Sequence, residues 1–336
     1  MVARSIPFIE LYAGDHERTV EHLTTELGLS RVAEAAGRTS RAVLLQQGTL
    51  RLVVTSGDGT EDFLEAHGDG IADIALACSD VTGTRAAALA AGAADLGATG
   101  EAPVVSGFGA VRHTLVPESR AGGLPPGREW VPVADRQRPA ARIRLLDHVA
   151  ICVEGGSLER HVEFYAAFGL QRYSSEFVDV GDSSMDSVVV RSASGEVTFT
   201  LVAPGSTTGT GQLDAFLRRN DGPGVQHLAL LVDDIVAAVT EAAARGVVFL
   251  QTPAPYYDAL AARFPDIPEE IGRLRATNVL ADRDEWGYLL QLFTTSPHPR
   301  NTLFYEFIQR HGARGFGSAN IRALYEAVER DRPAVP

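Results

Sequence analysis

Two histidines and one glutamate stand out because each lies in an apolar, strand-like run. His148 lies in the run LLDHVAIC, His227 in GVQHLALL and Glu306 in TLFYEFIQ. Glu306 carries the only formal charge in its run before Arg310, and burying an unpaired carboxylate costs several kcal/mol. His148 and His227 are separated by 79 positions, and so are His227 and Glu306. We therefore predict that the three side chains share one site, in which a metal ion neutralises the carboxylate.

Two imidazoles and one carboxylate on one face of an octahedral ion leave three positions open. This ligand set is typical of non-haem Fe(II) oxygenases, which use the open positions for a chelating substrate and for O₂. A single histidine in an apolar strand is more often a hydrogen-bonded core residue. Two histidines at equivalent points of a repeat make metal binding about as good a hypothesis as a core role.

The remaining histidines are weaker candidates for metal ligands. None of them combines an apolar strand with an equivalent partner elsewhere in the chain. His16, His22 and His161 fall on predicted helices, His67 and His298 in predicted loops, His113 on a predicted strand, and His311 in a polar segment after Glu306.

An internal repeat predicts the elements that position these residues. The segment 70–81 aligns without gaps with 224–235, an offset of 154 residues, and both continue through an Ala-rich stretch to a glycine. Each copy reads as a strand with alternating apolar residues, then a helix capped by Asp80 or Asp234, ended by Gly92 or Gly246.

A second pair of similar segments begins each half of the chain. Residues 6–12 and 146–153 read as strands, followed by helices capped by Asp15 and Ser157 and by short β-rich runs such as 41–45, 49–56, 187–191 and 197–203. The repeating unit is therefore βαβββ, present four times. The predicted fold class is α+β, with four modules paired into two open-barrel domains whose curved sheets can enclose a pocket.

The predicted domain boundary lies in a stretch rich in Gly, Pro and Arg, residues 118–144. We expect an N-terminal domain at 1–135, a linker at 136–144 and a catalytic domain at 145–336. In the first half, Phe8 stands at the position of His148 and Asp73 at that of His227. The first domain is therefore expected to lack the metal site and to be structural.

Composition excludes several classes of partner. The 336 residues include 43 acidic and 30 basic side chains, a formal charge of -13, which disfavours nucleic acid and anionic membranes. The arginines at 136, 138, 142 and 144 are interpreted as a solvated linker. No apolar run is long enough for a membrane span or a signal peptide, and two cysteines, Cys78 and Cys152, fit a reducing cytosol.

Beyond these patterns, the chain resembles a known family. The segments Gly224–His227, Leu289–Thr294, Thr302–Arg310 and Gly315–Ile321 are similar to 4-hydroxyphenylpyruvate dioxygenase and its close relatives the 4-hydroxymandelate synthases. The resemblance implies the vicinal-oxygen-chelate fold, Fe(II) as cofactor and His148, His227 and Glu306 as its ligands. It also implies a C-terminal helix at 320–330 that caps the pocket. The substrate-binding residues it implies are Ser187, Thr200, Gln291, Phe293, Phe316, Asn320 and Ile321.

The resemblance further implies the substrate and, through one residue, the product. Family members decarboxylate 4-hydroxyphenylpyruvate with O₂; dioxygenases then form homogentisate, and the synthases form 4-hydroxymandelate. Dioxygenases typically carry phenylalanine where this chain has Ile321, and a smaller side chain lets the benzylic carbon approach the oxidant. We therefore expect 4-hydroxymandelate formation, in the service of 4-hydroxyphenylglycine-containing antibiotic peptides, with homogentisate formation as the alternative.

Two other functions on the same fold are weighed against this one. A metal-free binding protein would not need a carboxylate in an apolar strand, and an extradiol ring-cleaving dioxygenase would not need the Gly315–Ile321 motif. The segment 254–275 reads either as a lid or as a long connection. A homodimer is left open.

Overall fold

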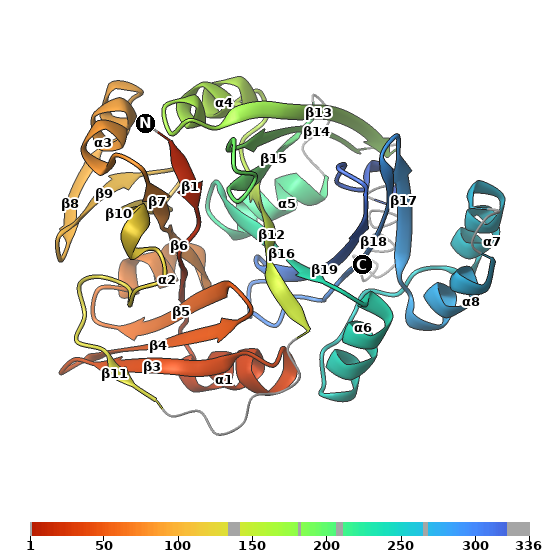
Figure 1. The fold of residues 1–336 in the computed structure, drawn as a ribbon, viewed down its shortest axis with the longest axis horizontal. Helices are drawn as coiled ribbons and strands as arrows, with labels where there is room; N and C mark the ends of the chain where they lie inside the picture. Colours follow the sequence, from red (N-terminus) through yellow and green to blue (C-terminus); the bar gives the residue numbers. More distant parts are fainter. Residues whose placement is uncertain (1, 134–141, 181–182, 206–210, 265–267, 321–336) are drawn as a thin grey trace, which may run out of the picture.

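The computed structural model describes residues 2–133, 142–180, 183–205, 211–264 and 268–320. Its strands form two sheets, one in each half of the chain, which lie side by side in Figure 1. The two-domain reading of the sequence thus corresponds to two separate sheets.

The first half contains an eleven-stranded sheet in the order β1-β7-β10-β6-β2-β5-β4-β3-β11, with β9 beside β10 and β8 beside β9. The strands are β1 Ala3–Ser5, β2 Ile9–Tyr12, β3 Ser30–Ala36, β4 Ser40–Gln47, β5 Leu50–Gly57, β6 Gly70–Ile74, β7 Leu76–Cys78, β8 Asp95–Thr99, β9 Ala102–Ser106, β10 Arg112–Pro117 and β11 Val131–Pro132. The helical segments are α1 His16–Glu21, the π-helix η1 His22–Glu26, α2 Glu61–His67, α3 Val81–Ala90 and the 3₁₀ turn η2 Glu118–Arg120.

The second half contains an eight-stranded sheet in the order β13-β14-β15-β12-β16-β19-β18-β17. The strands are β12 Ile143–Cys152, β13 Gln171–Val180, β14 Ser183–Arg191, β15 Thr198–Pro204, β16 Gly224–Val232, β17 Leu280–Asp284, β18 Gly287–Phe293 and β19 Phe304–His311. The helices are α4 Leu158–Ala166, α5 Gln212–Arg219, α6 Ile235–Ala244, α7 Ala254–Arg263 and α8 Pro268–Thr277. The sheet curls around a central space, with α5 on its concave side (Figure 1).

Both sheets confirm the predicted βαβββ module. In each half two modules meet along an antiparallel pair, β2 with β6 and β12 with β16. Within each module the first strand pairs in parallel with the last one, as β12 does with β15 and β16 with β19. The first strands of the two modules therefore lie at the centre of the sheet.

Local sequence signals explain most helix ends. Asp15, Asp80 and Asp234 accept hydrogen bonds from backbone N–H groups at the starts of α1, α3 and α6, as predicted. Ser157 also precedes α4, but its hydroxyl donates to the carbonyl of Glu154 instead of capping the helix. Gly92 and several other glycines adopt positive φ at the helix ends.

Three expectations about elements change in the structure. The strand expected at 6–12 begins only at Ile9, as β2, and residues 6–8 around Pro7, which has no N–H to donate to a ladder, separate it from β1. His67 is the last residue of α2 and does not lie in a loop. Ile143 and Arg144, placed in the expected linker, are the first residues of β12, and residues 134–141 lie outside the described part of the chain.

The segment 254–275, expected to be a lid or a long connection, is largely helical in its described residues. It contains helices α7 and α8, which pack against each other on the outside of the second sheet (Figure 1). Tyr257 is buried there, and the hydroxyl of Tyr256 accepts a hydrogen bond from the backbone N–H of Ala281 on β17. In the described ranges, no helix has the length and apolar character needed to cross a membrane.

One apolar core joins the two halves. Its largest cluster includes buried side chains from both halves, among them Leu23, Leu52, Phe168 and Phe199. Polar contacts also cross the boundary: His113 Nε2 lies 3.0 Å from the hydroxyl of Tyr165. The first half therefore supports the second through buried contacts.

Candidate metal centre

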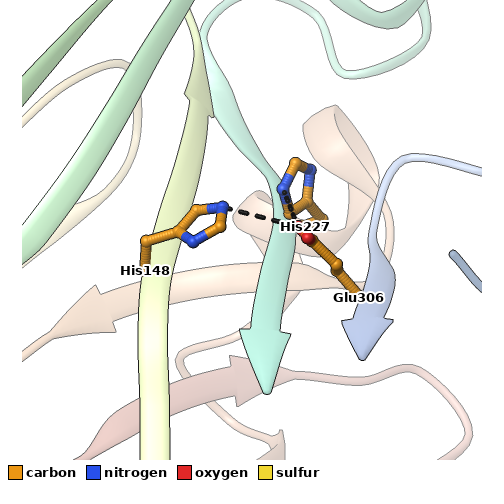
Figure 2. Close-up of side chains that lie close together, drawn as sticks. All are labelled: His148, His227 and Glu306. Carbon is orange, nitrogen blue, oxygen red and sulfur yellow. Dashed lines mark ion pairs between the residues drawn. The ribbon is translucent and has the colours of Figure 1, made fainter. Parts of the chain in front are cut away.

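His148, His227 and Glu306 meet on the concave face of the second sheet, and Figure 2 shows their side chains pointing toward one another. His148 Nε2 lies 3.4 Å and His227 Nε2 3.2 Å from Glu306 Oε2. The ligand atoms of the three residues all lie within 4.8 Å of one another. The side chain of Glu306 is 2% exposed, so its charge is removed from water.

Strand register brings these residues together. They come from β12, β16 and β19, which are neighbours in the sheet. Ala229 of β16 pairs with both His148 of β12 and Glu306 of β19, while His227 pairs with Ala150. Because side chains two residues apart share a face, both histidines, the glutamate and the two alanines lie on the same side. The small alanines leave space into which the imidazoles extend.

Each imidazole is oriented by the residue that precedes it. His148 Nδ1 lies 2.9 Å from Asp147 Oδ1, and His227 Nδ1 lies 3.2 Å from Gln226 Oε1. Because both acceptors are oxygens, each neutral ring carries its proton on Nδ1 and presents the Nε2 lone pair toward Glu306. Metal-ligating histidines commonly have this second hydrogen bond.

The donor set fits a metal ion. Two ligand atoms at right angles on an ion, each about 2.1 Å from it, are about 3 Å apart, close to the distances observed. Glu306 Oε1 and His227 Nε2 are buried and have no hydrogen-bond partner among the described residues. A cation placed between the three residues would satisfy both atoms.

The pKa values of the three groups show the same need for positive charge. Burial lowers the pKa of His148, but its hydrogen bonds to Asp147 and Glu306 outweigh this and raise it to about 9. Burial lowers the pKa of His227. Burial raises the pKa of Glu306, yet its contacts with the two imidazoles bring it below the ordinary value. A proton on His148 therefore takes the role that an ion would have.

A cavity of about 530 Å³ opens above the three residues. Five of the residues predicted to bind substrate line it: Ser187, Thr200, Gln291, Phe293 and Phe316. Thr200 Oγ1 and Gln291 Oε1 are buried there without a hydrogen-bond partner in the described chain, whereas Ser187 Oγ donates to the carbonyl of Glu176. Two polar atoms are thus available to a ligand in an otherwise largely apolar space.

The two phenylalanines contact the metal-site histidines. The ring of Phe293 lies edge-on to His227 at 6.0 Å, and that of Phe316 lies edge-on to His148 at 5.1 Å. Gly317, which has a φ of +77°, lets the chain pass Gln291 closely, since a Cβ there would lie 2.0 Å from Gln291 Oε1. The described part of the motif, 315–320, therefore contributes Phe316 to the cavity wall.

Asn320 and Ile321 are the remaining predicted substrate residues. Asn320 is fully buried, but it is not among the residues that line the cavity, and its Oδ1 accepts a hydrogen bond from the Tyr256 hydroxyl at 2.8 Å. Ile321 and the expected C-terminal helix at 320–330 lie, apart from Asn320, outside the described residues.

Among the described residues, none of the other histidines belongs to the candidate metal cluster. His311 stacks on Tyr288 with ring centres 4.3 Å apart, and His298 is buried beside Asp69. Two residues beside the site had not been suggested by the sequence, namely Asp147 next to His148, and Arg310 bound to Asp147. An acidic residue directly before the histidine of an apolar strand was the available signal for Asp147.

Comparison with known proteins places this site in a family. Residues 147–276 match the model of the glyoxalase/bleomycin resistance protein/dioxygenase superfamily. The 4-hydroxyphenylpyruvate dioxygenase of Neurospora crassa is 32% identical over 81% of this chain and 71% of its own. The chain belongs to the 4-hydroxyphenylpyruvate dioxygenase family.

Solved structures agree with this assignment and with the vicinal-oxygen-chelate fold. A mutant of 4-hydroxymandelate synthase from Streptomyces coelicolor superposes with a TM-score of 0.91 at 47% identity, over 99% of this chain and 100% of that one. A halotolerant catechol dioxygenase, BphC, has a TM-score of 0.53 at 14% identity over 92% of this chain and 87% of its own, a likeness of fold alone. This protein is therefore an enzyme of the dioxygenase family, with a buried His-His-Glu candidate metal site.

Proposed function

We propose that the protein is a 4-hydroxymandelate synthase. It would convert 4-hydroxyphenylpyruvate and O₂ into 4-hydroxymandelate and CO₂, with one oxygen atom entering the benzylic carbon and the other the new carboxylate. The observation that carries the proposal is a buried His-His-Glu cluster in a chain 47% identical, over its full length, to a mutant of that synthase.

The proposed ion is Fe(II), held by His148, His227 and Glu306. Bound iron would supply the oxidation chemistry by accepting the 2-oxo acid and activating O₂. The chain's own contribution is to hold the proton of each neutral imidazole on Nδ1 and to aim Nε2 at the ion, through the acceptors on Asp147 and Gln226. A metal-free binding function leaves the buried carboxylate of Glu306 without a purpose.

The cavity would hold the aromatic ring of the substrate. Gln291 and Thr200 have unused buried oxygens, which suit a phenolic hydroxyl, and Ser187 lines the same wall. Phe293 and Phe316, which contact the two histidines, would confine the ring near the ion. We assign these roles to the second domain, 145–336, and a structural role to the first, 1–135.

Product choice is proposed to depend on Ile321. An isoleucine fills less space beside the ring than a phenylalanine does, so the benzylic carbon can lie nearer the oxidant. The alternative product is homogentisate, which the relation to 4-hydroxyphenylpyruvate dioxygenases supports; that of Aspergillus fumigatus is 29% identical over 96% of this chain and 91% of its own.

The test is product identification. The purified protein is loaded with Fe(II) without oxygen, then given 4-hydroxyphenylpyruvate and air, and the product is compared with standards by chromatography and NMR, because the two candidates are isomers. We expect 4-hydroxymandelate from the wild type and a shift toward homogentisate in Ile321→Phe. Homogentisate as the main wild-type product would refute the assignment, and an unchanged ratio in the variant would place the selector elsewhere.

We also propose the cellular setting. Two free, buried cysteines suit a cytoplasmic enzyme, and the product would serve 4-hydroxyphenylglycine supply for peptide antibiotics. A homodimer is proposed as the form to look for, by light scattering of the purified protein.

A further inference from the structure

We propose that Asp147 and Arg310 form a positioning pair, which fixes the imidazole of His148 and ties it to the segment 313–316, called the cavity wall below because its Phe316 lines the metal-site cavity. The inference rests on the proposed function only in taking the bound ion as Fe(II). Neither residue lines the 530 Å³ cavity above the candidate metal site. They would therefore influence that site through His148 and Phe316.

The first half of the argument is the contact between the pair and the imidazole. Asp147 Oδ1 accepts the Nδ1 proton of His148 at 2.9 Å. Arg310 binds the same carboxylate at two points, Nη2 to Oδ1 and Nε to Oδ2, each at 2.7 Å. A two-point contact of planar groups fixes their relative orientation as well as their distance. The imidazole therefore hydrogen-bonds to a carboxylate that cannot turn freely.

The second half is the contact between Arg310 and the cavity wall. Its third nitrogen, Nη1, donates to the carbonyl of Gly315 at 2.7 Å and that of Ala313 at 3.3 Å. Its guanidinium also lies over the ring of Phe316, 5.2 Å from the centroid. Because the Phe316 ring in turn contacts His148, the contacts form a closed circuit through Asp147, Arg310, Phe316 and His148.

A β-bulge explains how Asp147 reaches its neighbour's ring. On β12, Leu146 pairs with Leu230 and His148 with Ala229, which leaves Asp147 without a partner in the ladder. In a regular strand, adjacent side chains point to opposite faces, whereas the extra residue of a bulge is re-aimed. The local backbone therefore favours this contact.

The two imidazoles are held unequally. Gln226 also lies at a bulge, because Ala150 pairs with His227 and Ile151 with Val225. Its neutral amide lies 3.2 Å from His227 Nδ1, compared with 2.9 Å for the Asp147 carboxylate and His148. A charged acceptor makes the stronger hydrogen bond and increases the basicity of the ligand. We therefore assign the charged support to His148 alone.

The location of the pair makes it suitable for mutation. Asp147 and Arg310 line a second cavity of about 890 Å³ between the two halves, and Phe316 borders both cavities. Substitutions at these two positions therefore open onto existing space and create no void in the apolar core. Folded variants are expected.

The experiment compares Asp147→Asn and Arg310→Lys with a control, Asp233→Asn. The control breaks the exposed Arg144–Asp233 ion pair, which involves the same strand, β12, away from the site. Fe(II) affinity is measured without oxygen by competition with a chelator, and hydrogen exchange of amides 313–316 is measured in the metal-free protein. Asn at position 147 can still accept the hydrogen bond from the imidazole but has no charge. Lys at position 310 lacks the planar guanidinium, whose several N–H donors bind Asp147 and Gly315 at the same time.

We expect Asp147→Asn to weaken Fe(II) binding about 10- to 100-fold. Arg310→Lys should weaken it by at least about 10-fold and also accelerate exchange at Gly315 and Phe316. The double variant should lose little more affinity than the weaker-binding single variant, because the two residues act through each other. Asp233→Asn should match the wild type in both measurements.

Wild-type Fe(II) affinity in Asp147→Asn, or wild-type exchange in Arg310→Lys, overturns the proposal. If the wild type itself binds no Fe(II), the proposed function fails instead. The exchange measurement in the metal-free protein then still decides whether Arg310 holds the cavity wall.

Discussion

The two halves of the molecule share one backbone plan but use its centre differently. In the second half the centre holds His148, His227 and Glu306, with no cation in contact with the free carboxylate oxygen among the described residues. In the first half the matching strand positions hold Phe8, Asp73 and Thr114, since Asp73 pairs with Arg112 as His227 pairs with Phe304. The same strand register therefore holds a candidate metal site in the second half and a cluster of carboxylates and arginines in the first.

The first half supplies its own cations. Asp73 accepts from Arg112 Nε at 3.0 Å, and Glu10 pairs with both Arg112 and Arg128. Thr114 donates its hydroxyl to Asp73 at 2.5 Å. Even the bulge is retained, because Ala72 has no ladder partner, at the position that corresponds to Gln226. Backbone geometry thus permits a metal site, and side chains decide whether protein or ion provides the positive charge.

The largest loss of activity is expected from a substitution of Glu306 in the second half. Glu306→Gln keeps the shape of the side chain but removes the charge that a metal ion would neutralise. We expect turnover to fall more than about 100-fold and Fe(II) binding to be lost, with an unchanged circular dichroism spectrum. His227→Ala provides a second test, and undiminished Fe(II) binding in both variants would exclude this metal site.

The corresponding change in the first half should affect stability and not activity. Asp73→Asn leaves Arg112 with Glu10 as its only carboxylate partner in the described chain, so we expect a loss of about 2–3 kcal/mol in the free energy of unfolding. Urea denaturation measures this loss. Fe(II) affinity and turnover at saturating substrate should stay within about twofold of the wild type; a large loss of turnover would show that the first half takes part in the chemistry.

The pH dependence of stability tests the contribution of His113, a buried residue of the first half that contacts the second. Burial lowers the pKa of His113 to about 4, below its ordinary 6.5. Between pH 6.5 and 4 the unfolded chain therefore binds more protons than the native one, so stability falls as the pH falls. Lowering the pH from 7 to 5 should cost about 2 kcal/mol through this residue. Denaturation curves of His113→Gln should show a weaker pH dependence, and an equal dependence would contradict the prediction.

The smallest expected effect concerns a single contact between the halves. Tyr165→Phe removes the hydroxyl that lies 3.0 Å from His113 Nε2 and leaves that nitrogen buried without a partner. We expect a loss of about 1–2 kcal/mol in stability by urea denaturation. Turnover should be unchanged in the folded protein, and reduced turnover would indicate that this contact positions the metal site.

Much of the fold and the centre of the site could be predicted from the sequence. The four modules follow from local signals, such as the caps Asp80 and Asp234 and alternating apolar residues, which act within a few positions. His148, His227 and Glu306 were recognisable because polar groups in apolar strands are costly. The late start of β2 at Ile9 and the helices within 254–275 were not predicted, since strand pairing and helix packing depend on distant partners.

The sequence alone determined which half could hold a metal, because only the second half carries two histidines and a glutamate at the repeated positions. The tertiary structure alone decided what surrounds them. The contact of Asp147 with Arg310 joins residues 163 positions apart, and it depends on a bulge and on strand register that no local pattern encodes. The cost of burying polar groups makes the metal-site residues recognisable in the sequence, whereas long-range strand pairing determines which side chains surround them.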